Sequence, residues 1–134
     1  MHTLLKNRRL LVCLFFPCFM QAGVMAEMPG RSLKTIKEVI SVPMRDGTLL
    51  STNISMSDNR NEKLPLILVR TDSNKEAMDM LGYFFAFKGY AVAIQDVRGR
   101  FASGGEWEPF VNEAQDGYDA IEWLAPREWC NGMV

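Results

Sequence analysis

Residues 90–107 read YAVAIQDVRGRFASGGEW, an apolar run that leads directly into a loop rich in glycine. A strand with one solvated face would alternate apolar and polar residues, and residues 90–96 do not alternate. We therefore predict a strand that is buried on both faces, as in a parallel sheet. The loop after it lies beyond the carboxyl end of this strand, where open α/β sheets bind their ligands.

A similar strand and a helix precede this stretch. Residues 65–69 read PLILV, a second continuous apolar run that we also expect to be buried on both faces, and residues 71–75 form a polar turn. Apolar residues then recur at helical spacing until Lys88-Gly89, a pair that suits a helix end. We expect this helix to turn its apolar side chains into the core: Ala77, Met80, Leu81, Phe84, Phe85 and Phe87.

A further helix and a hairpin complete the pattern. In the helix, predicted at residues 112–124, we expect Tyr118, Ile121, Trp123 and Leu124 to face inward and Asp116, Asp119 and Glu122 to face water. Two β-rich runs at 36–44 and 48–56 flank residues 45–47, whose Asp-Gly pair supplies the positive φ angles of a tight hairpin turn. The order hairpin, strand, helix, strand, helix predicts the α/β class, with a parallel sheet covered on both faces.

The N-terminal 26 residues have the pattern of a secretory signal peptide. Lys6, Arg8 and Arg9 precede an apolar run at residues 10–20, and residues 24–26 supply the small side chains of a cleavage site. The run falls short of the ~20 residues that span a bilayer, so we expect no stable membrane anchor after cleavage. The predicted organisation is a signal peptide at 1–26, a flexible leader at 27–35 and a partial domain at 36–134. We expect an exported protein, periplasmic or extracellular.

Composition excludes several functions for the predicted mature chain. The chain carries no basic cluster, which argues against a nucleic-acid partner. Its single cysteine, Cys130, offers neither a disulfide framework nor a metal-binding pair, and we expect no metal and no cofactor. The only histidine of the sequence, His2, lies in the predicted signal peptide. A Ser-His-Asp triad needs an imidazole at neutral pH, so these mature residues cannot form one by themselves.

An ordered series of short motifs runs through almost the whole predicted mature chain. It begins with Pro43 and the turn at 45–47, and continues with LILVR at 66–70, GYAV at 89–92, QDVRG at 95–99 and GEW at 105–107. It ends with Asn112-Glu113, DGYD at 116–119, Glu122-Trp123 and WCNG at 129–132. In this order the motifs resemble the cocaine-esterase-like and Xaa-Pro dipeptidyl-peptidase-like family of serine α/β-hydrolases, which includes bacterial α-amino acid ester hydrolases.

The resemblance implies the N-terminal half of an α/β-hydrolase sheet, truncated before the strand that carries the nucleophile. In that family a strand ending in a Gly-x-Ser-Tyr-x-Gly turn follows the Trp-Cys-x-Gly motif, and its serine is the nucleophile. The sequence stops at Val134, where that strand would begin. We therefore expect no catalytic residue in these residues, with the triad and the helical cap further on. The family's sheet order also places the 64–69 strand between the 90–96 strand and the missing strand.

Ser73 is the candidate for the oxyanion position. The family often places a tyrosine hydroxyl there from an Arg-x-Pro-Tyr segment, and here that segment reads RTDS at residues 70–73. Ser73 has a shorter reach, and the carboxylate of Asp72 beside it would oppose an oxyanion. Ser103 lacks the leading glycine of a nucleophile elbow and has no histidine to activate it, so we expect no nucleophile there.

Asp96, Arg98 and Gly99 follow the central strand and have two interpretations. In the functional one they lie at the mouth of an active site. In the structural one Asp96 and Arg98 form an ion pair that holds the loop, while Gly99 frees the backbone. We favour the structural interpretation.

Three interpretations of function remain open. The first is an N-terminal fragment of a secreted serine hydrolase acting on acyl or aminoacyl ester or amide bonds, or on Xaa-Pro peptide bonds, and inactive alone. The second is a non-enzymatic secreted remnant or binding protein. The third is one half of a split hydrolase, whose partner is a complementing hydrolase chain. We expect a small acyl or peptide substrate only for an intact version of the hydrolase.

Overall fold

The computed structural model describes residues 34–59 and 61–134. The predicted signal peptide and all of the predicted leader except its last two residues lie outside these ranges. The first strand begins at Thr35, one residue before the predicted start of the domain. None of the helices in the described ranges is both long and apolar enough to cross a membrane.

The predicted hairpin is confirmed. Strands β1 (Thr35–Pro43) and β2 (Leu49–Ser57) pair antiparallel along their full length, from Thr35 opposite Ser57 to Pro43 opposite Leu49. At the turn the backbone of Gly47 has a φ of 84°, the left-handed conformation that glycine adopts without strain. The amide of Met44 donates to the carbonyl of Thr48 over 2.8 Å and closes the turn.

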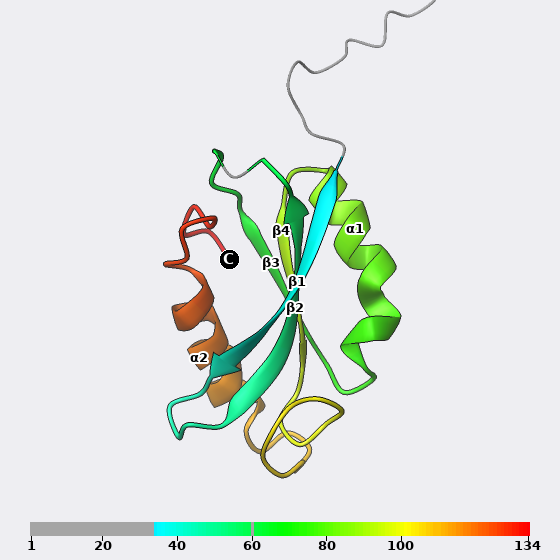
Figure 1. Cartoon of the computed structure of the whole chain (residues 1–134). Coiled ribbons are helices and arrows are strands. Elements are labelled where there is room, and N and C mark those ends of the chain that lie inside the picture. The colour runs from blue at the N-terminus through cyan, green and yellow to red at the C-terminus, as the bar shows by residue number, and fades with distance from the viewer. Residues whose placement is uncertain (1–33, 60) are drawn as a thin grey trace, which may run out of the picture.

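The two apolar runs form the parallel part of one mixed sheet. Strands β3 (Leu66–Thr71) and β4 (Ala91–Asp96) pair in parallel, β4 pairs antiparallel with β2, and the order is β1-β2-β4-β3 (Figure 1). The α/β class is therefore confirmed. Every residue of β4 is buried, as predicted, because strands flank it on both sides. The same expectation for β3 is wrong: of its six residues Leu66 alone is buried, because β3 is the last strand in this order.

The outer edge of β3 is partly occupied by residues 129–133. Leu64 donates to the carbonyl of Trp129 and accepts from the amide of Asn131, and the amide of Leu66 donates to Met133 over 2.9 Å. Amides of alternate residues in a strand point to the same side. The amides of Leu68 and Arg70 therefore face this edge, and neither has a backbone partner among the described residues.

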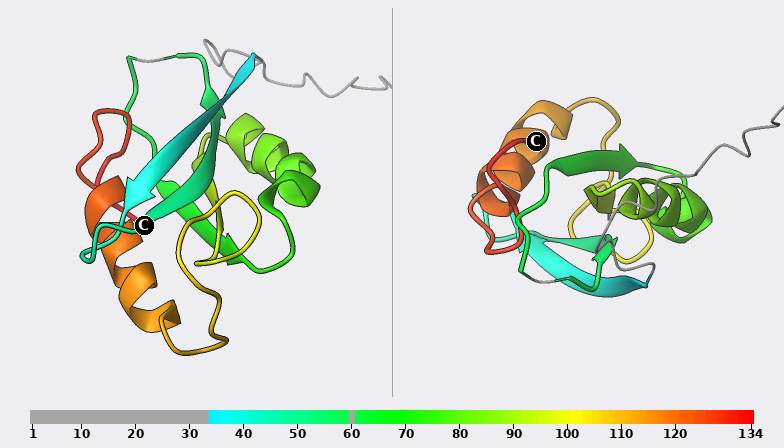
Figure 2. Two further views of the ribbon diagram at one scale, coloured as in Figure 1. Left: turned by 60° about the horizontal axis from the view of Figure 1, so that its bottom comes forward. Right: turned by 90° about the horizontal axis from the view of Figure 1, so that it is seen from above.

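The helices lie on opposite sides of the sheet (Figures 1 and 2). A short 3-10 helix, η1 (Lys75–Met78), leads into α1 (Asp79–Phe87), which contacts β2 and β4. Helix α2 (Glu113–Leu124) covers the other side and contacts β1. Gly89 follows α1 with a φ of 93°, which confirms the helix end predicted at Lys88-Gly89.

The predicted inward face of α1 is wrong at its exposed large residues, Met80, Phe84 and Phe87, whereas Leu81 and Phe85 are partly buried. The residues of α1 that are buried are Gly82 and Ala86, whereas Met80 is 79% exposed and both Phe84 and Phe87 are more than half exposed. The reason is the short distance between α1 and β2: a Cβ atom at Gly82 would lie 3.0 Å from Oγ of Ser55. Only small side chains fit at that distance, and Met80, Phe84 and Phe87 turn outward.

The predicted inward face of α2 is wrong at three positions. Tyr118 and Ile121 are exposed, and Asp116, which we expected in water, is buried. The buried residues follow one another at four-residue spacing: Asp116, Ala120 and Leu124. A carboxylate lies on this face because it has arginine partners, as the site below shows. Leu124 joins the main hydrophobic cluster with residues of β2 and β4.

Candidate functional site

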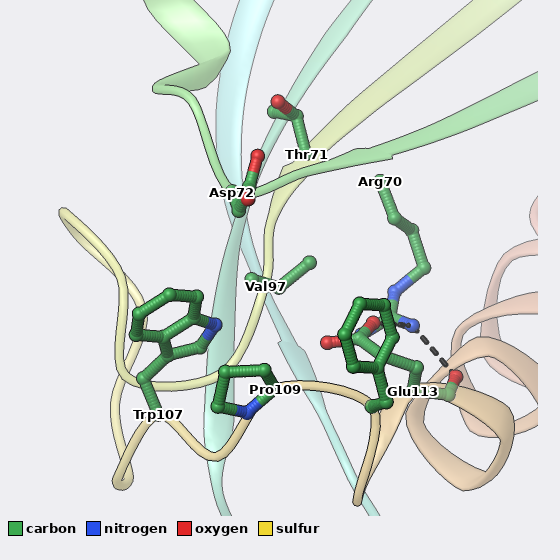
Figure 3. A pocket seen from close by; sticks show the side chains of 8 residues that line it. Arg70, Thr71, Asp72, Val97, Trp107, Pro109 and Glu113 are labelled. Carbon is green, nitrogen blue, oxygen red and sulfur yellow. Dashed lines mark hydrogen bonds and ion pairs between the residues drawn. The ribbon is translucent and has the colours of Figure 1, made fainter.

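The carboxyl ends of β3 and β4 open onto a hollow of about 280 Å³. Its lining combines the end of β3, the loop after β4 and the start of α2: Arg70, Thr71, Asp72, Val97, Trp107, Pro109, Phe110 and Glu113. In Figure 3, Trp107 lies on one side of this hollow and Arg70 and Glu113 on the other, with Val97 between them. This is the position at which open α/β sheets bind ligands.

The loop after β4 folds back on itself at Gly99. The φ of Gly99 is 68°, and its amide donates to the carbonyl of Gly104 over 2.9 Å. A Cβ atom at Gly99 would lie 2.2 Å from the backbone nitrogen of Trp107, so two segments of main chain meet here. The amide of Gly104 then donates to Leu49, which attaches the loop to the hairpin. Glycine at position 99 therefore sets where Trp107 lies.

The predicted ion pair between Asp96 and Arg98 is wrong. Arg98 instead makes two hydrogen bonds with the carboxylate of Asp116, at 3.0 and 2.7 Å, and a third with Asp46 at 2.6 Å. The hydrogen bonds that Arg98 donates to Asp116, and then the one that it donates to Asp46, raise the pKa of Arg98 above its usual value. In return, the hydrogen bond from Arg98 holds the pKa of Asp46 well below its usual range. Arg98 thus joins the loop to α2 and to the hairpin turn.

Asp96 holds the segment that follows β3. Its carboxylate accepts hydrogen bonds from the backbone amide of Lys75 over 2.7 Å and from the Lys75 ammonium over 3.2 Å. Both side chains are buried, and the two charges neutralise each other. Asp96 therefore fixes the start of η1 relative to β4. Lys75 was not singled out in the sequence, where it ends the polar turn predicted at residues 71–75.

Arg70 lies in the wall of the hollow and was likewise not singled out. Its Nε donates to Gln95 over 3.0 Å, and one Nη donates to both the carbonyl and the carboxylate of Glu113 over 2.7 Å. Its other Nη is buried 3.7 Å from Asp116 and has no hydrogen-bond partner among the described residues. Asp116 therefore lies between two arginines, Arg70 and Arg98, which accounts for a buried carboxylate on α2.

The two candidate serines have different surroundings. Oγ of Ser103 donates to the carbonyl of Asp96 over 2.6 Å and accepts from the amide of Ser51 over 2.9 Å, so this hydroxyl joins the loop to β2. Ser73 is exposed, and its Oγ donates to the carboxylate of Asp72 over 2.8 Å. Its neighbours Thr71 and Asp72 line the hollow. The oxyanion role of Ser73 stays a prediction.

The described residues offer polar and apolar walls but few reactive groups. Among them, no group of three histidine, cysteine or acidic residues is placed to hold a metal ion. Their cysteine, Cys130, is buried. The hollow thus brings the aromatic loop after β4 next to the polar residues at the end of β3.

Comparison with known proteins identifies the family. The model of the family described as X-Pro dipeptidyl-peptidase (S15 family) matches residues 46–134. The cocaine esterase of Rhodococcus sp. (strain MB1 Bresler) is 37% identical over 103 residues, which make up 71% of this chain and 17% of the esterase.

Solved structures agree with this assignment. An α-amino acid ester hydrolase labelled with selenomethionine superposes with a TM-score of 0.64 at 26% identity, over 87% of this chain and 23% of that protein. A CocE/NonD family hydrolase from Staphylococcus aureus has the same TM-score at 28% identity, over 73% of this chain and 22% of that protein. The chain thus spans less than a quarter of the length of each relative. The match over residues 46–134 and the shared sheet show that the chain belongs to the X-Pro dipeptidyl-peptidase (S15) family of hydrolases and corresponds to the N-terminal part of its α/β fold.

Proposed function

We propose that this chain is the N-terminal part of the catalytic domain of an exported serine hydrolase, and that these 134 residues alone do not hydrolyse substrate. The bond class is that of the family: acyl or aminoacyl esters and amides, or Xaa-Pro peptides. The observation that carries the proposal is the hollow at the carboxyl ends of β3 and β4, in a chain whose family consists of hydrolases.

Within this function the segment after β3 supplies the oxyanion position. Ser73 is the residue that replaces the family's tyrosine, and its hydroxyl donates a hydrogen bond to the carboxylate of Asp72. A donor to a developing oxyanion is worth about 3 kcal/mol, or roughly 10²-fold in rate. We therefore infer that an enzyme containing this segment is slow, and that restoring proline and tyrosine accelerates it.

A chimeric enzyme tests both statements. The matched segment of the Rhodococcus cocaine esterase is replaced by the corresponding residues of this chain, and hydrolysis of p-nitrophenyl acetate is measured. We expect a folded chimera with a low kcat, and a kcat that rises about 10²-fold in the double variant Asp72→Pro, Ser73→Tyr. The same double variant in the 134-residue chain is the matched control and should hydrolyse nothing.

Two results would contradict the proposal. One is a chimera that folds by circular dichroism but stays inactive even with the tyrosine restored. The other is covalent labelling of the 134-residue chain by a fluorophosphonate at Ser73 or Ser103, which would reveal a nucleophile of its own.

A complementing chain is the second candidate, and the free edge of β3 favours it. Among the described residues the amides of Leu68 and Arg70 have no backbone partner at this edge, and sheet edges of this kind pair readily with another strand. Mixing this chain with a separately produced remainder of the cocaine esterase tests the idea. Activity in the mixture that neither piece shows supports a split enzyme, and its absence from a mixture that co-elutes argues against it.

Export is a separate part of the proposal. Residues 1–26 carry the signal-peptide pattern described above, with cleavage after Ala26. Expression of the full gene product in a bacterial host, followed by N-terminal sequencing of the exported protein, should give a chain that begins at Glu27. A product that stays inside the cell with Met1 intact would contradict export and would leave the rest of the proposal unaffected.

A further inference from the structure

Arg100 connects the loop after β4 to the segment that carries Ser73. Its Nε donates to the backbone carbonyl of Asp72 over 3.1 Å. Its guanidinium also lies over two rings of its own loop, with Cζ 5.1 Å from the ring centroid of Phe101 and 4.6 Å from that of Trp107. A guanidinium can stack on rings with its faces and donate from its edge at the same time. The rings therefore hold the group in place for its hydrogen bond to Asp72.

The backbone around Arg100 forms a tight turn. The amide of Arg100 donates to the carbonyl of Val97 over 3.1 Å, and the carbonyl of Arg100 accepts from the amide of Ser103 over 2.9 Å. Phe101 has a φ of 48°, the left-handed conformation, which a bulky residue keeps only where its surroundings impose it. Strained positions of this kind concentrate at functional sites. The side chain of Arg100 thus starts from a backbone with little freedom.

The peptide group between Asp72 and Ser73 is held from both sides. Arg100 binds its carbonyl, and its amide donates to Oγ1 of Thr71 over 3.0 Å. Because a peptide group is planar, hydrogen bonds on its two opposite edges fix its orientation. That orientation sets the direction in which the side chain of residue 73 leaves the backbone. Neither contact involves the side chain of Asp72, so both remain possible when proline replaces it.

We propose that Arg100 is a positioning residue, which directs the side chain at position 73 toward the oxyanion through the carbonyl of Asp72. The proposal rests on the hydrolase function proposed above and on the oxyanion role of position 73. Arg100 acts through the backbone and not by contact with the substrate. A donor stabilises the oxyanion only within hydrogen-bond distance of it, so loss of the positioning contact should lower kcat and leave KM unchanged.

The contact itself is tested in the 134-residue chain by nuclear magnetic resonance. Hydrogen exchange of the Ser73 amide is compared between the unmodified chain and Arg100→Met, which removes every donor of the guanidinium and keeps an unbranched side chain. We expect exchange at Ser73 to be about ten-fold faster in this variant, because one of the two contacts that hold the peptide group is lost.

Arg127→Met is the matched control. Arg127 also lies over a tryptophan ring, with Cζ 3.6 Å from the ring centroid of Trp123, and its Nε also donates to a backbone carbonyl, over 2.8 Å. Both of these contacts lie at the end of α2, away from the segment after β3. The control variant should therefore leave exchange at Ser73 unchanged.

Kinetics of the chimera test the role in catalysis. In the chimera with Asp72→Pro and Ser73→Tyr, Arg100→Met should lower kcat for p-nitrophenyl acetate about ten-fold with KM unchanged. In the chimera with the native segment, where Ser73 has the shorter reach, it should change kcat by no more than about two-fold. Arg100→Lys keeps a charged donor and should restore part of the loss. General destabilisation would affect both chimeras equally, so the difference between them measures positioning.

Three results would overturn the positioning role: unchanged exchange at Ser73, an equal fall of kcat in both chimeras, or an equal effect of Arg127→Met. The proposed hydrolase fails separately. An active chimera that is indifferent to Arg100→Met retains the hydrolase and removes the positioning role. A folded but inactive chimera contradicts the hydrolase and with it the catalytic role of Arg100, whereas the exchange measurement still shows whether Arg100 holds the segment.

Discussion

The path of the loop after β4 requires a residue without a side chain at position 99. A Cβ atom there would lie 2.2 Å from a backbone nitrogen, and no rotation of a side chain can relieve that contact. We expect Gly99→Ala to lower the free energy of unfolding by about 2–5 kcal/mol, through the clash and the positive φ together. Urea unfolding followed by circular dichroism measures the change.

Gly47→Ala separates the two causes. Gly47 also has a positive φ, but nothing lies within 4 Å of a Cβ atom built there. It should cost about 1 kcal/mol, the conformational penalty alone. Equal effects of the two substitutions would mean that the loop moves aside at Gly99 and that the contact with Trp107 is unimportant.

Asp116 is the residue on which two arginines depend. Its carboxylate is almost fully buried and bonds Arg98 twice, with Arg70 on its other side. Asp116→Asn removes the charge and leaves both guanidinium groups poorly matched, so we expect a loss of about 3–5 kcal/mol in the free energy of unfolding. Thermal and urea unfolding of the variant measure it.

Asp119, on the same helix, gives the matched control. It binds Arg45 over 2.7 Å, but the side chain of Arg45 is more than half exposed. The solvent around Arg45 screens this pair, so Asp119→Asn should lower the urea midpoint much less than Asp116→Asn. A large loss at Asp119, or none at Asp116, would show that burial does not decide the strength of these pairs.

At this scale the sequence predicts types of residue better than their partners. The glycine-rich loop after β4 is visible in the sequence, and so is the presence of charged residues near it. The partners of Arg98 are not, because they lie 18 and 52 residues away and are brought to it by the hairpin and by α2. Nearness in sequence suggested Asp96, which turns instead toward Lys75.

Helix α1 is an element whose small residues, and not its large ones, face the sheet. Gly82 and Ala86 are its buried residues. Ala86→Leu should therefore cost about 1–3 kcal/mol by overpacking. Met80→Ser, at a position that is 79% exposed, should change the free energy of unfolding by no more than about 0.5 kcal/mol. Denaturant midpoints compare the two, and the opposite ranking would mean that the large face of α1 is the buried one.

The elements themselves were predictable where their patterns were strong. The hairpin, both apolar strands and both helices occur close to their predicted bounds, because turn residues and hydrophobic periodicity are local properties. The buried face of each helix was not predictable in the same way. It depends on how closely the helix approaches the sheet and on whether a buried charge finds a partner, as Gly82 and Asp116 show.

The whole molecule is tied together by charge as well as by its core. Lys37 on β1 binds Glu76 over 2.6 Å and Asp79 over 2.7 Å, which joins the outermost hairpin strand to η1 and α1. The hydrogen bond from Lys37, followed by that from Asn53, lowers the pKa of Glu76 from its usual value of 4.5 to about 2. Both contacts hold η1 and the start of α1 against the hairpin.

Stability should fall in acid for this reason. Because the folded protein holds Glu76 ionised below the pKa of the unfolded chain, the unfolded state binds more protons as the pH drops. The contribution is complete above about pH 4.5 and is lost as the pH falls toward about 2. Urea midpoints across this range should show the loss, and Glu76→Gln should make the decline shallower. A variant with an unchanged slope would assign the acid sensitivity to other carboxylates.

For the whole molecule, the sequence predicts where the candidate site lies but not which residues line it. The rule for strand ends places a site after β3 and β4, and the hollow lies there. Except for Val97, its apolar walls come from the residues after 106, whose path is set by the backbone contact at Gly99. No local pattern in the sequence encodes that contact, so Trp107 and Phe110 were not selected in advance.

The buried thiol of Cys130 can report how often the segment at residues 129–133 detaches from β3. Its thiol is 3% exposed, accepts a hydrogen bond from the amide of Gly132, and lies where residues 129–133 bridge to Leu64 beside β3. A thiol reagent reaches it only when this segment leaves the strand. With Cys13 and Cys18 replaced by serine, the labelling rate of Cys130 therefore reports how often the segment detaches, and a strand that extends the pairing along β3 should slow it. Labelling as fast as that of an unfolded peptide would mean that the segment does not stay on the strand.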